Sequence, residues 1–138
     1  MRRKFKRLLS AITFMSGETH PPMKTSIRSG ERYFGVEIKP DGRIVVVERT
    51  AGRRLPPAYF PAGAQGAVAL RRHIERDNAH PHVCIKACGA AALALAAALV
   101  PVRGVEVTMV ARHVFQASAG ASAEEHAENL ARLAERLF

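Results

Sequence analysis

The stretch that decides the fold is HVCIKACGAAALALAAALV, His82 to Val100, followed closely by VEVTMVAR, Val105 to Arg112. A β-rich run ends at Lys86, a turn with Gly89 follows, and an apolar run long enough for a helix leads to a second β-rich run. The pattern therefore predicts strand, turn, helix and strand. Because α/β folds place their chemistry at the carboxyl ends of strands, Lys86 stands where a functional residue is expected.

Upstream of this stretch, the sequence predicts a β-hairpin. Tyr33–Ile38 and Arg43–Thr50 are both rich in β-branched and aromatic residues. Between them, Pro40-Asp41-Gly42 is typical of a tight turn, because proline presets φ and glycine accepts a positive φ. The elements expected next are a loop over 51–57, a short strand over 58–60 and a helix over 65–77.

The C-terminal region predicts an amphipathic helix. Ser122 and Glu125 match the S-x-x-E capping box found at many helix starts. Small and apolar residues then recur at four- and three-residue spacing, as Ala123, Ala127, Leu130, Ala134 and Leu137. Two heptads are too short to form a stable coiled coil alone. This seam therefore packs either on the sheet or against a second chain, in a homodimer through Leu130, Ala134 and Leu137.

The order of these elements, β-β-(β)-α-β-α-β-α, predicts the fold class. A hairpin followed by two crossover units gives an α/β domain with a mixed sheet flanked by helices, arranged as in ribonuclease H-like folds. The length of 138 residues and the 48% hydrophobic content suit one domain. We expect this domain to cover residues 32–138.

The first 31 residues differ in composition from the rest. Of the net charge of +9, the first 30 residues carry +6, from seven Lys/Arg against the single acid Glu18. Apolar residues from Phe5 to Met15 follow helical spacing, so 2–15 is expected to form a basic amphipathic helix, with 16–31 as a linker. A signal peptide is the competing reading, but the apolar region is short and no A-x-A cleavage site follows.

Such a basic appendage suits a polyanionic partner. The candidates are nucleic acid and an anionic membrane surface, and we favour nucleic acid or a protein over a membrane. No apolar run in the sequence has the length and flanks of a membrane-spanning segment.

The two cysteines, Cys84 and Cys88, are expected to be buried free thiols in a reducing compartment, which favours a cytoplasmic protein. His80 and His82 lie close by, but the spacing of the four residues fits no standard zinc pattern. Cys88 precedes a predicted helix, a position that lowers the pKa of a thiol, yet nothing in the sequence places a base such as His126 beside it. We therefore expect neither a metal site nor a cysteine nucleophile.

Four segments in order carry a resemblance to a known family: YFGVEIKPDGRIVV, VCIKACG, VEVTMVAR and SAEEHAENLARLA. They resemble the first hairpin, the Glu-Ala/Thr-Thr-Gly strand, the Asn-Pro-Arg strand and the Lys-Thr-Asp-x-x-Asp-Ala helix of the N-terminal domain of DEDD transposases. These are the Piv-invertase-like, RNA-guided recombinases of insertion sequences. The similarity lies in motif order over residues 33–134, and it implies a ribonuclease H-like fold that acts on nucleic acid.

In the family, four acids hold divalent metal, and the resemblance carries them onto Glu37, Lys86, Ala123 and His126. Only Glu37 is an acid here. A two-metal site needs several carboxylates, and an ammonium ~4 Å from Mg²⁺ costs about 8 kcal/mol at an effective dielectric near 20. We therefore expect no catalysis and no cofactor, and Mg²⁺ would bind only if the Glu37 site retained function. Lys86 is expected either to pair with Glu37 or to extend into solvent.

These observations leave three hypotheses for function. The first is a catalytically degenerate, transposase-like domain that binds nucleic acid or a partner protein. The second is an interaction or assembly module that docks through its basic N-terminal helix. The third is a truncated transposase fragment, since the family's serine-containing half does not follow. The expected phosphate contacts are Arg2, Arg3, Lys4, Lys6, Arg7, Arg53, Arg54, Arg71, Arg72 and Arg112.

Overall fold

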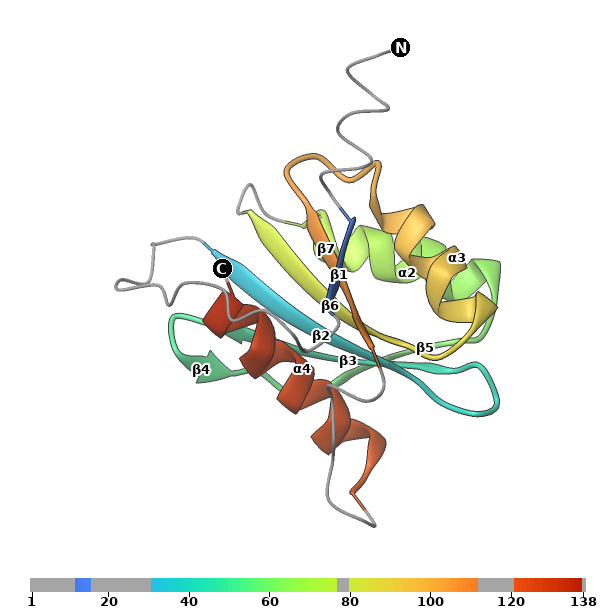
Figure 1. Cartoon of the computed structure of the whole chain (residues 1–138), viewed down its shortest axis with the longest axis horizontal. Helices are drawn as coiled ribbons and strands as arrows, with labels where there is room; N and C mark the ends of the chain where they lie inside the picture. Colours follow the sequence, from blue (N-terminus) through green and yellow to red (C-terminus); the bar gives the residue numbers. More distant parts are fainter. Residues whose placement is uncertain (1–11, 16–30, 77–79, 112–120, 138) are drawn as a thin grey trace.

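The protein folds as a mixed α/β structure around an open sheet (Figure 1). A computed structural model describes residues 12–15, 31–76, 80–111 and 121–137. The strands are β1 (Ile12–Met15), β2 (Arg32–Ile38), β3 (Ile44–Thr50), β4 (Arg53–Arg54), β5 (Ala58–Phe60), β6 (Pro81–Ala87) and β7 (Glu106–Ala111). The helices are α2 (Ala64–Ile74), α3 (Ala90–Leu99) and α4 (Ala123–Leu137).

The sheet has the order β1-β7-β6-β2-β3-β4, and β5 also pairs with β3. The strands β2 and β3 form the predicted antiparallel hairpin, with Val36 opposite Val46. On the other side of β2, the strands β6, β7 and β1 follow in parallel. The carboxyl ends of β2 and β6 therefore lie at the same edge of the sheet, which is where the sequence placed Lys86.

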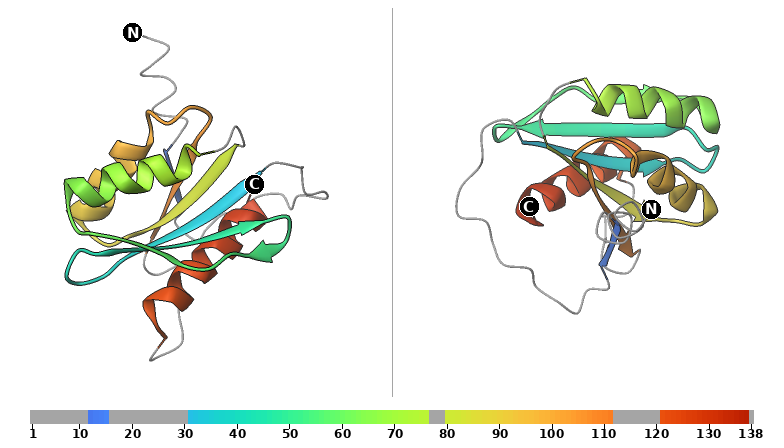
Figure 2. Two further views of the ribbon diagram at one scale, coloured as in Figure 1. Left: turned by 180° about the vertical axis from the view of Figure 1, so that it is seen from behind. Right: turned by 90° about the horizontal axis from the view of Figure 1, so that it is seen from above.

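Helices cover both faces of the sheet (Figure 2). On one face, α2 and α3 contribute residues such as Leu70 and Leu95 to a core with Phe34 and Val36. On the other face, Leu130 and other small or apolar residues of α4 form a second core. They pack against the strand residues that alternate with those of the first core and point to the opposite side of the sheet. Each central strand is thus apolar on both faces, as expected for strands covered on both sides.

The helix α4 approaches β2 very closely because Gly35 has no side chain. A Cβ atom at Gly35 would lie 1.8 Å from the backbone oxygen of Ala127 and 2.4 Å from the nitrogen of Ala131. Leu130 and Ala134 are fully buried within the chain. Of the two alternatives for the seam, packing on the sheet is therefore the one observed, and the chain itself covers these two residues.

The predicted capping box is confirmed at the start of α4. The backbone nitrogen of Glu125 donates to Ser122 Oγ at 3.1 Å, and the backbone nitrogen of Ser122 donates to the carboxylate of Glu125 at 3.3 Å. These bonds satisfy donors that the first turn of a helix leaves without intrahelical partners. The box therefore fixes where α4 begins.

Three predictions about local structure were wrong. Ile12–Met15 is not the end of a helix but a strand that pairs with β7, while residues 2–11 and most of the expected linker lie outside the described residues. The expected loop over 51–57 contains the short strand Arg53–Arg54, because Arg54 pairs with Arg49 of β3. The helix expected to reach residue 77 ends at Ile74.

Candidate functional site

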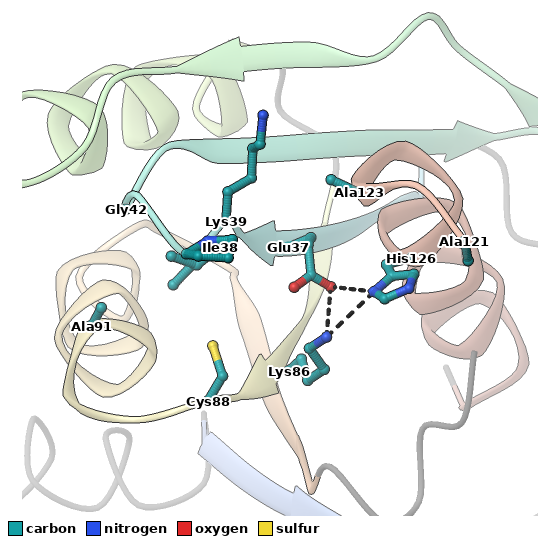
Figure 3. Close-up of a pocket in the computed structure, with 11 residues that line it drawn as sticks. Glu37, Ile38, Lys39, Gly42, Lys86, Cys88, Ala91, Ala121, Ala123 and His126 are labelled. Carbon is teal, nitrogen blue, oxygen red and sulfur yellow. Dashed lines mark hydrogen bonds and ion pairs between the residues drawn. The ribbon is translucent and has the colours of Figure 1, made fainter. Parts of the chain in front are cut away.

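Three side chains from three elements meet at the carboxyl edge of the sheet (Figure 3). Glu37 lies one residue before the end of β2, and Lys86 lies one residue before the end of β6. His126 lies in the first turns of α4, which the capping box and the close contact at Gly35 hold over β2. The side chains point toward one another, so residues far apart in sequence form one cluster.

The carboxylate of Glu37 is the centre of this cluster. Lys86 Nζ lies 3.0 Å from Glu37 Oε2, and His126 Nδ1 lies 3.1 Å from the same oxygen. The Glu37 side chain is only 8% exposed, while those of Lys86 and His126 are 16% and 23% exposed. The first of the two expectations for Lys86, pairing with Glu37, is therefore the arrangement observed.

The protonation of His126 decides which of its neighbours it bonds. Its Nδ1 atom also lies 3.4 Å from Lys86 Nζ. A ring that carries hydrogen on Nδ1 donates to Glu37, whereas a ring without it accepts from the ammonium of Lys86. In the first state Glu37 accepts from both Lys86 and His126, and in the second Lys86 donates to both Glu37 and His126. In both states the ammonium of Lys86 lies beside the carboxylate of Glu37.

The cluster lines a cavity of about 620 Å³. Cys88 and Ala91 at the start of α3 form one wall, and Ala121 and Ala123 at the start of α4 form another. Lys39, after β2, also lines the cavity, but its side chain points away from Glu37. The four positions named by the family resemblance, Glu37, Lys86, Ala123 and His126, thus all lie around this one cavity.

These residues do not fit a divalent metal. Among the described residues, no group of three or more His, Cys, Asp or Glu side chains is arranged to hold a metal ion. At the cluster, Glu37 and His126 are the two conventional ligands, and Lys86 places a positive charge beside both. A hard dication prefers several oxygen ligands and is repelled by an ammonium at this distance.

The second group considered for metal binding is dispersed by the fold. His82 is buried, stacks on the ring of Tyr33 at 5.3 Å, and lies between the carboxylates of Glu31 and Glu106. His82 lies within β6, in agreement with the strand predicted to begin at this residue. His82 belongs to a cluster at the amino end of the central strands, away from the cavity.

The two cysteines are free thiols with different surroundings. Burial raises the pKa of the Cys84 thiol to about 12, so this residue is unreactive at neutral pH. Cys88 is only partly buried and lines the cavity, so the expectation that both cysteines are buried holds for Cys84 alone.

The candidate phosphate-binding residues do not gather in one place. Arg53 and Arg54 are exposed on β4, and Arg54 lies 3.5 Å from Glu128 of α4. Arg71 and Arg72 are exposed on α2, which covers the face of the sheet opposite to α4 (Figure 2). The remaining candidates lie outside the described residues: Arg2, Arg3, Lys4, Lys6, Arg7 and Arg112.

One buried cluster was missed by sequence reasoning. The guanidinium of Arg32 forms a two-point ion pair with Glu48, at 2.7 and 3.0 Å, and both residues are buried. Arg32 and Glu48 lie on the adjacent strands β2 and β3 but are not directly opposite each other. Arg32 pairs with Thr50, so Glu48 is its diagonal neighbour. The signal was present in the hairpin register, where a cation and an acid on opposite strands lie two residues apart.

Comparison with known proteins does not assign the chain to a family. In the described part of the chain, no helix has the length and apolar character needed to cross a membrane. No protein-family model matches the chain, and no curated protein matches it.

Proposed function

We propose that this protein is a non-catalytic, ribonuclease H-like domain of transposase type that binds nucleic acid. One observation carries the non-catalytic part. Lys86 Nζ lies 3.0 Å from Glu37 Oε2 and 3.4 Å from His126 Nδ1. An ammonium held there satisfies the only acid among the four family positions and repels a second cation. The cluster of Glu37, Lys86 and His126 therefore holds the carboxyl edge of the sheet together without a bound metal.

The strand order supports the finer fold assignment. An antiparallel β2-β3-β5 meander, followed by β6 and β7 parallel to β2 and linked through α2 and α3, is the arrangement expected of ribonuclease H-like domains. The convergence of Glu37, Lys86, Ala123 and His126 on one cavity also supports the family resemblance, because those positions were chosen from motif order alone.

The charge distribution supports nucleic acid as the partner. The first 30 residues carry +6 of the net charge of +9. In the described residues, α2 adds exposed Arg71 and Arg72 on a face where α3 carries no charged residue. On the opposite face, Arg49 and Arg54 pair with glutamates of α4 that are at most 20% exposed, which leaves these arginines less suited to phosphate. Arg71 also pairs with a carboxylate, Glu75, but both of these side chains are more than 40% exposed, so that solvent weakens the pair. We therefore place the phosphate contacts of the folded domain on α2.

The non-catalytic part is tested with labelled branched and duplex DNA and single-stranded RNA in the presence of Mg²⁺ or Mn²⁺. We expect no cleavage or strand joining by the full chain. Metal-dependent cleavage that disappears in the Glu37→Gln variant would contradict the proposal, because it would show that Glu37 binds a functional metal.

The binding part is tested by a salt titration with the same nucleic acids. Each phosphate contact contributes a slope of roughly 0.9 to log K against log[salt] on duplex DNA. We expect the Arg71→Gln/Arg72→Gln variant to bind more weakly and to lose about two units of slope. Arg136→Gln, an exposed residue of α4, is the matched control and should leave the slope unchanged. Binding that is absent, or insensitive to salt, rules out a nucleic-acid-binding function.

A further inference from the structure

A second cavity lies on the α2 and α3 side of the sheet. It has a volume of about 360 Å³, and all of its described lining residues are apolar or glycine. Ala67 of α2 and Ala94 and Ala98 of α3 form its walls, and Ile44 lies among its remaining lining residues. We call this cavity the α2–α3 groove. A concave apolar surface of this kind is typical of a site that receives apolar side chains.

The composition of α3 is an independent sign that a partner covers the α2–α3 groove. All residues of α3 are alanine or leucine, and a helix that is apolar on every side is normally buried on every side. Here Ala91 and Ala94 line the groove and are exposed to solvent. On α2, Val68 is 51% exposed, and on α3, Leu93 is 55% exposed. The small alanine side chains leave room for a partner to approach closely.

The rim of the groove carries a positive charge. Lys39 and Arg43 adjoin the lining residues of the hairpin turn, and Arg71 lies one helical turn after Ala67 on the same side of α2. With the exposed Arg72, these segments carry four cations among the described residues, and the carboxylates of Asp41 and Glu75 offset two of them. Those carboxylates pair with Arg43 and Arg71, at 2.7 and 2.9 Å. The groove therefore offers apolar contacts at its centre and favours negative charge at its edge.

This combination selects among partners. Nucleic acid has no apolar side chains to fill a concave groove. A lipid surface contacts projecting apolar residues such as Val68 and Leu93 but does not fill a groove between two helices. A second copy of the chain offers the acidic helix α4, but the apolar face of α4 already packs on its own sheet. An amphipathic helix of another protein supplies both features, with apolar anchors on one side and carboxylates beside them.

We propose that the α2–α3 groove binds an acidic amphipathic helix of a partner protein. Apolar side chains at i, i+3/i+4 and i+7 of that helix fill the groove between Ala67 and Ala94. Carboxylates flanking them contact Arg71, Arg72 and the cations of the hairpin turn. The proposal goes beyond nucleic-acid binding. It shares Arg71 and Arg72 with the phosphate contacts proposed above, but the apolar groove is separate from them and its test uses no nucleic acid.

The probe is a synthetic amphipathic peptide with leucines at these positions and glutamates on its flanks, and a matched peptide has lysines in place of the glutamates. Binding to the full chain is measured by fluorescence anisotropy. We expect the acidic peptide to bind at least about tenfold more tightly than the basic one. Ala94→Trp, which fills the groove, should weaken binding of the acidic peptide at least about tenfold. Ala97→Trp is the matched control, because Ala97 is exposed on α3 but does not line the groove, and it should bind as the native chain does.

Two further measurements separate the contributions. Arg71→Gln/Arg72→Gln should weaken the acidic peptide about fivefold, and this difference should shrink as salt is added. The proposal is overturned if the two peptides bind equally, or if Ala94→Trp and Ala97→Trp bind alike. It is also overturned if anionic phosphatidylserine vesicles bind in an Ala94-dependent way while the acidic peptide does not, since that result assigns the groove to a membrane.

Discussion

Two ion pairs of the central sheet, Arg32–Glu48 and Lys86–Glu37, each join one cation to one carboxylate but have different surroundings. Arg32 and Glu48 lie near the amino end of β2, and Glu37 and Lys86 lie near the carboxyl ends of β2 and β6. The carboxylates are nearly equally buried, at 9% and 8% exposure of the side chain. Burial alone therefore does not distinguish a structural pair from a candidate site.

The Arg32–Glu48 pair is closed by further bonds. Arg32 also donates to the backbone oxygen of Ile74 at 3.1 Å and lies over the ring of Phe34. Thr50 donates to Glu48 Oε2 at 2.8 Å. Burial raises the pKa of the Glu48 carboxyl, but the hydrogen bonds from Arg32 and Thr50 outweigh burial and hold this pKa below its usual range. The pair ties α2 to the hairpin and has a structural role.

The Lys86–Glu37 pair, in contrast, borders a cavity. One oxygen of Glu37 receives Lys86 and His126, and the cavity of about 620 Å³ lies next to them. Water can enter such a cavity and solvate a charge that loses its partner. The comparison shows that a candidate site differs from a structural ion pair in its access to solvent.

The first prediction removes the cation of the closed pair and has the largest expected effect. Arg32→Met leaves the carboxylate of Glu48 buried without its partner, which costs about 3–5 kcal/mol of unfolding free energy. Urea unfolding measures this loss. The Arg32→Met/Glu48→Leu variant should recover most of it, because no charge then remains buried. A loss below about 1 kcal/mol for Arg32→Met would contradict the structural role of this pair.

The second prediction converts the open cluster into a metal site. The triple variant Lys86→Glu/Ala123→Asp/His126→Asp places carboxylates at all four positions around the cavity. Because a ligand that binds only the folded state stabilises it, Mn²⁺ at a hundred times its Kd should add about 2.7 kcal/mol. Thermal unfolding with and without Mn²⁺ measures the shift, and the native chain should show none. Equal shifts in both proteins would show that Lys86 does not exclude the metal.

The third prediction tests how open the cluster is. Lys86→Met removes the ammonium but leaves His126 beside Glu37, with solvent close by. We expect a loss of only about 1–2 kcal/mol in urea unfolding, smaller than for Arg32→Met. The Glu37→Gln/Lys86→Met variant should recover it. If Lys86→Met cost as much as Arg32→Met, the contrast between the two pairs would be lost.

The same contrast explains what the sequence could and could not predict. Lys86 and Glu37 were found because strand ends and motif order identify positions, and their neighbours in the sheet follow from the hairpin and crossover pattern. The hairpin register makes Arg32 and Glu48 diagonal neighbours, but that register was not followed residue by residue, so the pair was missed. The bond from Arg32 to α2 follows from tertiary packing, which no local pattern predicts. The strand Ile12–Met15 was read as a helix because its apolar residues also fit helical spacing, and pairing with β7 overrides that preference.

The last prediction concerns His73, which adjoins the closed pair and has the smallest expected effect. Burial lowers the pKa of His73, and its ring contacts Phe34 and Phe60. Since the folded pKa lies below that of the unfolded chain, the unfolded state binds the proton first as the pH falls through about 6.5. Unfolding free energy should therefore decrease by less than about 1 kcal/mol between pH 7.5 and 5.5. His73→Gln should remove this decrease while retaining the steeper loss below pH 4.5, where protonation of Glu48 breaks its pair with Arg32. If the decrease between pH 7.5 and 5.5 were the same in His73→Gln as in the native chain, it would belong to another group, and the prediction would be contradicted.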